Sequence, residues 1–323
     1  MCQFTVVIPT YNRSRLLDRA IASALGQSLR PGQVIVVDDG SSDDTAEVCR
    51  KHGEAIQYVF QPNAGVAAAR NHGARLARHP WTAFLDSDDY WVPTHLEKIA
   101  AAIKSTSGRA RFYFADMQIS NGAADYTLWA RTGFKLEAPF RLAEDGTDWM
   151  LLQREPCSVQ CSVFNTETLL ASGGFDVRFR VSEDRDLFYR LGIGGPICAV
   201  NTVGCVQTSD ARQEHRLTGI MDTRSEGFWK LECLLWAGLM SRFSNLGPSH
   251  RRVMRCYLAI AHWRLARLYW RSGRIASSLI HLLQSLKTEP VFVLGFFRRG
   301  TSAGWEKTAP SAEPLPGKIL SPS

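Results

Sequence analysis

The chain has 323 residues, of which 45% are hydrophobic, 10% aromatic and 21% charged. This length suits one large domain or two smaller ones with a buried core, and the composition excludes a disordered or collagen-like chain. The formal net charge of +7 is unevenly distributed: residues 1–208 carry 21 Lys and Arg against 23 Asp and Glu, whereas residues 209–323 carry 17 against 8. The basic character belongs to the last third. No nucleic-acid-binding motif accompanies it, so we expect no nucleic-acid partner.

The eight cysteines include no C-x-x-C pair. We therefore interpret them as reduced thiols of a cytosolic protein rather than as a disulfide framework or a zinc site. The first residues run into the apolar residues 6–8 without a basic flank, so we expect no signal peptide. The longest apolar run, Val291 to Phe297, is too short to span a bilayer. We predict a cytoplasmic protein.

Short apolar runs alternate with amphipathic stretches over the first 120 residues. The predicted strands are Phe4 to Ile8, Val34 to Val37, Ile56 to Phe60, Ala83 to Leu85 and Arg111 to Ala115. The predicted helices between them are Ser14 to Leu25, 43–51, Val66 to Arg78 and Pro93 to Ile103. This alternation predicts an α/β fold with a mainly parallel sheet flanked by helices, which binds ligands beyond the carboxyl ends of its strands.

The rest of the chain is less regular and then becomes helical. We predict strands at Val159 to Phe164 and Ile197 to Val206, helices at Thr166 to Ala171 and Glu183 to Leu191, and a turn at Gly173-Gly174. The residue spacing over 259–290 is similar to a single tetratricopeptide (TPR-like) hairpin. We therefore predict an α/β domain at 1–215, a C-terminal α-helical appendage at 216–300 and a disordered tail at 301–323.

Three acidic clusters lie after predicted strands or at the start of a predicted helix, at residues 38–45, 86–89 and 183–186. Asp43 and Asp44 stand where a helix cap belongs, and we expect them to serve as one. The run Asp-Ser-Asp-Asp at 86–89 is different, because three carboxylates within four residues repel one another unless a cation or a donor network compensates them. A hard divalent cation that holds substrate phosphates suits such a run.

Common catalytic templates are absent from the sequence. There is no G-x-x-x-x-G-K-[ST], no G-x-G-x-x-G, no G-x-S-x-G and no H-E-x-x-H. Their absence argues against a P-loop NTPase, an NAD-binding Rossmann enzyme, an α/β-hydrolase and a zincin.

Five sequence blocks occur in a characteristic order. They are VVIPTYNR at 6–13, VVDDGSSDDT at 36–45, NAGVAAARN at 63–71, FLDSDD at 84–89, and GGFD at 173–176 followed by SEDRDL at 182–187. Together these blocks resemble family 2 glycosyltransferases. The resemblance implies a GT-A-type (Rossmann-like) fold and an inverting transfer of a sugar. The donor would be a nucleotide sugar, linked to UDP or dTDP, and the acceptor a hydroxyl of a glycan or lipid-linked acceptor.

The resemblance also assigns roles to single residues. Pro9 would end the first strand and send Thr10 and Tyr11 over the nucleoside pocket, where Asp38 would accept a hydrogen bond from the base. Arg70 would reach the base or the diphosphate, and Asp86 would meet the ribose hydroxyls. The metal, Mg²⁺ or Mn²⁺, would be held by Asp88 with help from Asp89, and by His215 in the segment after the last core strand. Arg212, His215 and Arg216 of that segment are the candidates for contacting the diphosphate. Asp184 would be the general base and Glu183 would orient the acceptor.

Two other functions remain open from the sequence. A nucleotidyltransferase also uses carboxylates and Mg²⁺ on an α/β sheet, although a basic Gly-rich loop would be expected where this chain has Pro-Thr-Tyr-Asn. A catalytically inactive nucleotide-sugar-binding or scaffold protein would not need a base such as Asp184.

The basic residues in the last third of the chain also allow two interpretations. The run of cations and aromatics at 263–271 fits an amphipathic helix with a solvated basic face. It also fits a surface that rests on anionic lipid, and residues 296–299 (FFRR) agree with that second reading. Peripheral contact with the inner face of the membrane through the basic C-terminal helices is thus one of two interpretations that the sequence leaves open.

Overall fold

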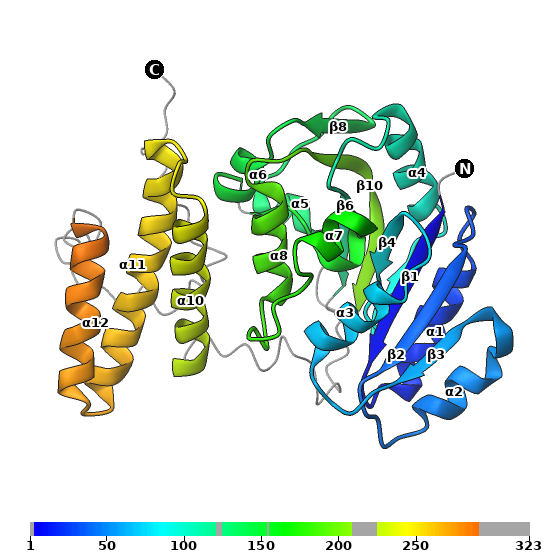
Figure 1. Cartoon of the computed structure of the whole chain (residues 1–323), viewed down its shortest axis with the longest axis horizontal. Coiled ribbons are helices and arrows are strands. Elements are labelled where there is room, and N and C mark those ends of the chain that lie inside the picture. The colour runs from blue at the N-terminus through cyan, green and yellow to red at the C-terminus, as the bar shows by residue number, and fades with distance from the viewer. Residues whose placement is uncertain (1–2, 121–124, 154, 209–224, 291–323) are drawn as a thin grey trace. The chain divides into compact units, whose positions relative to one another are not determined.

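The structure is a computed structural model that describes residues 3–120, 125–153, 155–208 and 225–290. The predicted tail at 301–323 and the basic residues at 296–299 lie outside the described residues. The chain divides into two compact units, residues 1–215 and residues 216–323 (Figure 1).

A ten-stranded sheet forms the framework of the first unit. Its strands are β1 Phe4–Thr10, β2 Gln33–Asp38, β3 Gln57–Phe60, β4 Trp81–Phe84, β5 Tyr90–Trp91, β6 Phe112–Ser120, β7 Asp125–Thr127, β8 Phe140–Ala143, β9 Ser162–Asn165 and β10 Ile197–Thr208. The order is β3-β2-β1-β4-β9-β6-β10-β5, with β7 beside β6 and β8 beside β10. Strands β3, β2, β1 and β4 are parallel, as predicted. Beyond β4 the sheet is mixed, because β9 pairs antiparallel with both β4 and β6.

The helices of the first unit follow the predicted alternation. They are α1 Ser14–Leu25, α2 Thr45–Lys51, α3 Val66–Arg75, α4 His95–Ser105, α5 Leu128–Thr132, α6 Thr147–Leu151, α7 Thr166–Ala171 and α8 Glu183–Gly192. Short turns of 3₁₀ helix lie at Gly53–Ala55 and Val159–Cys161. The buried residues of α1 are Leu17, Ala20, Ile21 and Ala24, which is the spacing of one helix face. α3 ends three residues earlier than predicted, and the short elements β5, β7, β8, α5 and α6 were not predicted.

Small residues bring α3 close to β1. A Cβ atom added at Gly73 would lie 2.3 Å from Val7 Cγ1, so only glycine allows this approach. Arg70 is one turn earlier on the same helix and is buried with a 3% exposed fraction. This close packing of α3 on β1 therefore places the Arg70 guanidinium at the edge of the sheet.

A cluster of aromatic rings anchors α8 on the mixed half of the sheet. Phe164 of β9 packs against Phe84 of β4, Phe112 of β6 and Phe188 of α8, with ring centroids 5.6 to 5.8 Å apart. Phe175 meets Phe84 at 5.1 Å. All five rings are buried, so the cluster holds α8 against the mixed half of the sheet.

The second unit contains α10 Glu226–Arg242, α11 Pro248–Arg271 and α12 Ile275–Thr288. α11 packs against both other helices and lies between them (Figure 1). A buried hydrophobic cluster of this unit comprises Phe228, Trp229, Ala261, Leu265 and Tyr269. α12 folds back on α11, where the Ser278 hydroxyl donates to the carbonyl of Ala266 and the Ser285 hydroxyl to that of Ala259. None of the described helices has the length and the apolar character needed to cross a bilayer.

Candidate active site

The loops after β1 and β2 are tied to each other at the carboxyl edge of the sheet. Asn12 donates its N–H to Ser41 Oγ at 2.9 Å, and its side-chain oxygen accepts from the N–H of Ser42 at 2.8 Å. Asn12 has a positive φ of 52°, a conformation that asparagine tolerates better than most residues. Asp43 adds a third link, because its Oδ2 accepts from the N–H of Ser14 at 2.9 Å. Asp43 Oδ1 also accepts from the N–H of Thr45 at 3.1 Å, whereas Asp44, at the N-cap position of α2, makes no side-chain cap hydrogen bond, so the cap predicted for Asp44 is wrong.

Asp38, predicted to contact the base of the donor nucleotide, is a buried carboxylate at the end of β2. Asp38 is 1% exposed. Its Oδ1 accepts from the N–H of Ser41 at 2.8 Å and its Oδ2 from the hydroxyl of Tyr58 at 2.7 Å. Burial and the bond to Asp38 raise the pKa of Tyr58 above its usual range. Both oxygens of Asp38 therefore already have one protein donor.

Around Asp38, the residues that follow β1 differ in exposure. Thr10 is buried, and its hydroxyl has no partner among the described residues, whereas Tyr11 is 46% exposed. Pro9 does not end β1 as predicted. It pairs in register with Val37, and the strand continues through Thr10, because the parallel ladder with β2 carries on to Asp38.

Asp39 is a residue whose role the sequence did not reveal. Its Oδ1 accepts from Gln61 Nε2 at 2.6 Å and from the N–H of Ala64 at 2.9 Å, and its Oδ2 accepts from the N–H of Gly65 at 2.8 Å. Asp39 thereby fixes the loop that leads into α3. The only signal in the sequence was its place beside Asp38 at the end of a strand.

The acidic residues 86–89 form a tight turn after β4. The N–H of Asp89 donates to the carbonyl of Asp86 at 3.1 Å, which closes the turn. Asp86, Asp88 and Asp89 each offer one carboxylate oxygen, and these atoms lie within 4.8 Å of one another. Oxygen donors gathered at one point are what Mg²⁺ or Mn²⁺ requires, so the residues fit the predicted metal.

Each carboxylate of this turn also has a protein partner. Asp86 accepts from Arg70 at 2.7 Å and from Gln160 at 2.5 Å. Asp88 Oδ2 lies 2.7 Å from Arg13 Nη1. Asp89 is 1% exposed and faces the N–H of Thr208 at the end of β10, at 3.4 Å. The mutual repulsion of the three acids is thus partly offset within the chain.

Arg70 connects the acidic turn to the start of α8. Besides Asp86, it donates to Glu183 Oε1 at 2.5 Å, and it lies over the ring of Phe175. Burial alone would lower the pKa of Arg70, but Asp86 and Glu183 raise it well above its usual range. Burial raises the pKa of Glu183 to about 7, while Arg70 opposes that shift. Arg70, Asp86 and Glu183, predicted separately, are therefore in direct contact.

Asp184 lies on the first turn of α8 and is partly exposed, unlike the buried Glu183. The helix follows Ser182, which has a positive φ of 62° and a buried hydroxyl with no partner among the described residues. Strained backbone of this kind concentrates at functional sites. Behind Asp184, Glu155 has a side chain that is 9% exposed and lies 3.5 Å from Arg185 Nε. Burial raises the pKa of Glu155 to about 8, and the charge of Asp184 adds to the shift.

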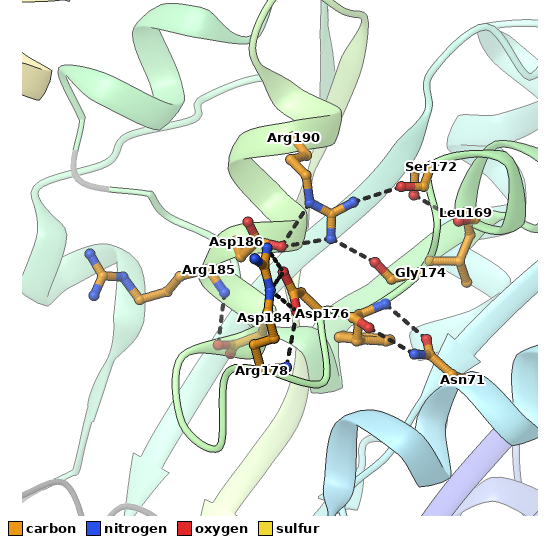
Figure 2. A network of polar contacts seen from close by, with 11 residues as sticks. Asn71, Leu169, Ser172, Gly174, Asp176, Arg178, Asp184, Arg185, Asp186 and Arg190 are labelled. Carbon is orange, nitrogen blue, oxygen red and sulfur yellow. Dashed lines mark hydrogen bonds and ion pairs between the residues drawn. The ribbon is translucent and has the colours of Figure 1, made fainter. Parts of the chain in front are cut away.

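A polar network holds the loop before α8 (Figure 2). Arg190 bonds to Asp186 at 2.7 Å and donates to the carbonyls of Ser172 at 3.0 Å and Gly174 at 2.6 Å. From α3, the amide of Asn71 donates to the carbonyl of Phe175 at 2.7 Å and accepts from its N–H at 2.8 Å. The loop that precedes Glu183 and Asp184 is therefore fixed from two sides. His215, Arg212 and Arg216 lie outside the described residues.

Comparison with known proteins identifies the family. Residues 5–131 match the family model described as glycosyl transferase family 2. Succinoglycan biosynthesis protein ExoW of Rhizobium meliloti (strain 1021) is 42% identical over 321 residues, which cover 87% of this chain and 98% of that protein. The chain belongs to glycosyl transferase family 2. This confirms the resemblance seen in the sequence blocks.

Other similarities cover part of a longer protein or concern the fold. Validoxylamine A glucosyltransferase of Streptomyces hygroscopicus subsp. limoneus is 46% identical over 104 residues, which are 30% of this chain and 23% of that protein. The chain thus spans about a quarter of the length of that relative. The crystal structure of S. aureus TarS 1-349 shares the fold, with a TM-score of 0.61 and 17% identity over 88% of this chain and 80% of that one. TarS 1-349 has also been solved in complex with UDP-GlcNAc, and that structure has a TM-score of 0.58 and 16% identity over 88% of this chain and 92% of that one. The predicted GT-A-type fold is confirmed.

Proposed function

We propose that the protein is an inverting glycosyltransferase that moves a sugar from a nucleotide-sugar donor to an acceptor hydroxyl during glycan assembly. The observation that carries this proposal is Arg70, which binds Asp86 of the acidic turn and Glu183 of α8 at the same time. The acid proposed to bind the donor and the helix that bears Asp184 are thus linked through one side chain. Membership of family 2 supports the same reaction class.

In the proposed reaction, Asp184 takes the proton of the acceptor hydroxyl while the acceptor oxygen attacks the anomeric carbon. The bond from that carbon to the diphosphate oxygen breaks, and the nucleoside diphosphate leaves from the opposite face, so the anomeric configuration inverts. Asp184 suits this role because it is the partly exposed acid beside buried Glu183. Glu183, held by Arg70, would fix the first turn of α8 and orient the acceptor.

Asp86, Asp88 and Asp89 would hold Mg²⁺ or Mn²⁺, with Asp86 also near the ribose. The metal would offset the negative charge that develops on the departing diphosphate. His215 stays a predicted ligand.

The donor is proposed to carry uracil or thymine. Each oxygen of Asp38 accepts one protein hydrogen bond, and a carboxylate has about four acceptor positions, which leaves room for the N3–H of such a base. Thr10, whose buried hydroxyl has no partner among the described residues, pairs with Asp38 across the two strands, and the exposed Tyr11 follows directly after β1. The UDP-GlcNAc complex of TarS, a protein of the same fold, supports UDP as the first nucleotide to test.

Asp184→Asn tests the proposal. We expect the variant to bind UDP and Mn²⁺ as the parent protein does by calorimetry, and to lose at least a hundredfold in UDP release from a UDP-sugar supplied with acceptor glycan. Asp176→Asn is the control, because Asp176 lies on the loop before α8 but pairs with the exposed Arg178. Normal turnover by Asp184→Asn would refute the assignment of the base.

Two outcomes of the same experiment would favour the alternatives. A parent protein that binds UDP-sugars without any turnover would indicate a binding or scaffold protein. Pyrophosphate release from a nucleoside triphosphate and a sugar phosphate would indicate a nucleotidyltransferase.

The acceptor is proposed to be lipid-linked, with the helical unit in contact with anionic lipid. The supporting surface is on α12 rather than in the run at 263–271, where Leu265, Ala266 and Tyr269 are buried. Large apolar side chains are exposed on one side of α12, and cations stand at its two ends. The apolar residues are Ile275, Leu279, Ile280 and Leu283, and the cations are Arg274, which also pairs with Glu226, and Lys287.

Cosedimentation with vesicles tests this contact. We expect the full chain to bind vesicles that contain phosphatidylglycerol better than pure phosphatidylcholine vesicles, and the double variant Leu279→Glu/Leu283→Glu to lose the difference. Leu234→Glu on α10 is the control. Equal binding by parent and double variant would contradict the proposed surface.

A further inference from the structure

Arg13 occupies a position in the acidic turn that a metal ion would also need. Its Nη1 lies 2.7 Å from Asp88 Oδ2, and the two side chains are 15% and 14% exposed. A divalent cation held by the turn would coordinate oxygens of the same carboxylate. Two cations on one partly buried carboxylate repel each other strongly, because solvent screens them poorly.

The local backbone directs Arg13 to this place. Arg13 is the residue before α1, and it follows Asn12 with its positive φ. Asn12 is bonded to Ser41 and Ser42, and the next residue, Ser14, is bonded to Asp43. The backbone on both sides of Arg13 is therefore fixed, so the Arg13–Asp88 contact is part of the loop design rather than a chance surface pair.

Within the part of the chain that the structure describes, Arg13 and Arg70 bind carboxylates of the turn, and Arg13 is the more exposed of the two. Arg70 is 3% exposed and is held by two carboxylates from different elements. The side chain of Arg13 is several times more exposed and extends from a loop. A donor diphosphate would offer Arg13 new anionic oxygens, and the guanidinium fork binds phosphate with two parallel hydrogen bonds.

We propose that Arg13 is the resident counter-cation of Asp88, which a divalent metal must displace, and that the diphosphate of the donor receives the displaced guanidinium. This inference rests on the proposed function, because it assumes a metal at Asp88 and a diphosphate beside it. Metal alone then binds weakly, since it must displace the Arg13 guanidinium from Asp88. Metal and nucleotide bind cooperatively, and each raises the affinity for the other by the same factor.

Mn²⁺ titration followed by electron paramagnetic resonance of the free ion measures this directly, with and without UDP. In the absence of nucleotide we expect Arg13→Gln to bind Mn²⁺ at least tenfold more tightly than the parent protein. We also expect the factor by which UDP improves Mn²⁺ binding to fall in this variant. Arg13→Lys keeps a cation beside Asp88 and should resemble the parent, which separates the charge from a general loss of structure.

Arg19→Gln is the matched control. Arg19 also reaches the turn, but its Nη2 donates to the main-chain carbonyl of Asp88 at 2.8 Å and not to the carboxylate. It should leave the affinity for Mn²⁺ alone unchanged. Unchanged Mn²⁺ affinity in Arg13→Gln, or equal tightening in Arg19→Gln, would overturn the inference. A parent protein that binds no Mn²⁺ even with UDP would instead refute the metal in the proposed function.

Discussion

Arg70 and Glu183 are 113 positions apart in the chain, yet Arg70 Nη1 donates to Glu183 Oε1 at 2.5 Å in the buried interior. The pair joins α3, which packs on β1, to the first turn of α8. Arg70 also donates to Asp86, which brings the acidic turn into the same contact. Three segments that carry different parts of the proposed chemistry are therefore held by one side chain.

Removal of the Arg70 guanidinium should lower the free energy of unfolding. Arg70→Gln leaves the carboxylates of Glu183 and Asp86 without their cation, and a buried charge that loses its partner destabilises a protein by about 3–5 kcal/mol. Adding Glu183→Gln to the same chain should restore about 1 kcal/mol or more, because one unpaired charge is removed. Urea unfolding of the parent, the two single variants and the double variant measures this. Strict additivity of the two single effects would contradict a direct pair.

Asn71 should affect turnover through the loop that it holds. Asn71→Ala deletes both hydrogen bonds to the main chain of Phe175, at a cost of about 1–3 kcal/mol in unfolding free energy. Because that loop leads into α8, we also expect kcat to fall about tenfold or more while the affinity for UDP changes little. Asn165→Ala removes the side-chain cap of α7 at a cost of about 1 kcal/mol and should leave kcat unchanged. A parallel loss of kcat in both variants would indicate general destabilisation.

His95 should set part of the acid sensitivity of the fold. It is fully buried, neither ring nitrogen has a partner among the described residues, and burial lowers its pKa to about 3. Below about pH 6.5 the unfolded chain takes up a proton that the folded chain refuses, so stability falls with pH, by at most about 1.4 kcal/mol per unit. His95→Leu should therefore flatten the decline of unfolding free energy between about pH 6 and pH 4. A variant with the same acid slope as the parent would show that His95 is protonated in the folded state.

Glu155 should have the opposite effect, at higher pH. Its pKa is raised by burial to about 8, so the folded protein holds a proton that the unfolded chain has already lost above pH 4.5. Stability is then full below about pH 4.5 and declines as the pH rises toward 8. Glu155→Gln should remove this decline and raise the melting temperature at pH 8 relative to pH 5, as measured by calorimetry. An unaltered difference between the two pH values would place the Glu155 ionisation below pH 5.

Much of the fold could be predicted because its elements are periodic and locally specified. α1 was predicted at its observed bounds, since its buried residues repeat at helical spacing and its neighbours are polar. β5 could not be predicted, because two residues carry no period and the strand exists only through its pairing with β10. The prediction that β1 ends at Pro9 was wrong for a similar reason, since pairing with the neighbouring strand decides how far β1 extends.

In the candidate site, too, some features could be predicted from the sequence and others could not. The acids of the turn and Glu183 were identifiable by type and position in their blocks. The contact of Gln160 with Asp86, at 2.5 Å, and that of Tyr58 with Asp38 were not, because each side chain is brought to its carboxylate by a separate strand or turn. Arg13 was part of a block, but its charge had no evident partner until Asp88 was seen beside it, 75 positions away.

The antiparallel strand β9 has a consequence for how the protein folds. It lies between β4 and β6, although it follows β4 by about eighty positions, and it brings α7 and then α8 behind it. The pairings of β1 with β2 and of β2 with β3 join residues 28 and 22 positions apart, so they close faster than the pairing of β4 with β9 across 80 to 84 positions. We expect β3-β2-β1 to assemble first, so that the nucleotide side of the sheet exists before Asp184 arrives. The ability to hold a donor would then appear during folding earlier than the ability to use it.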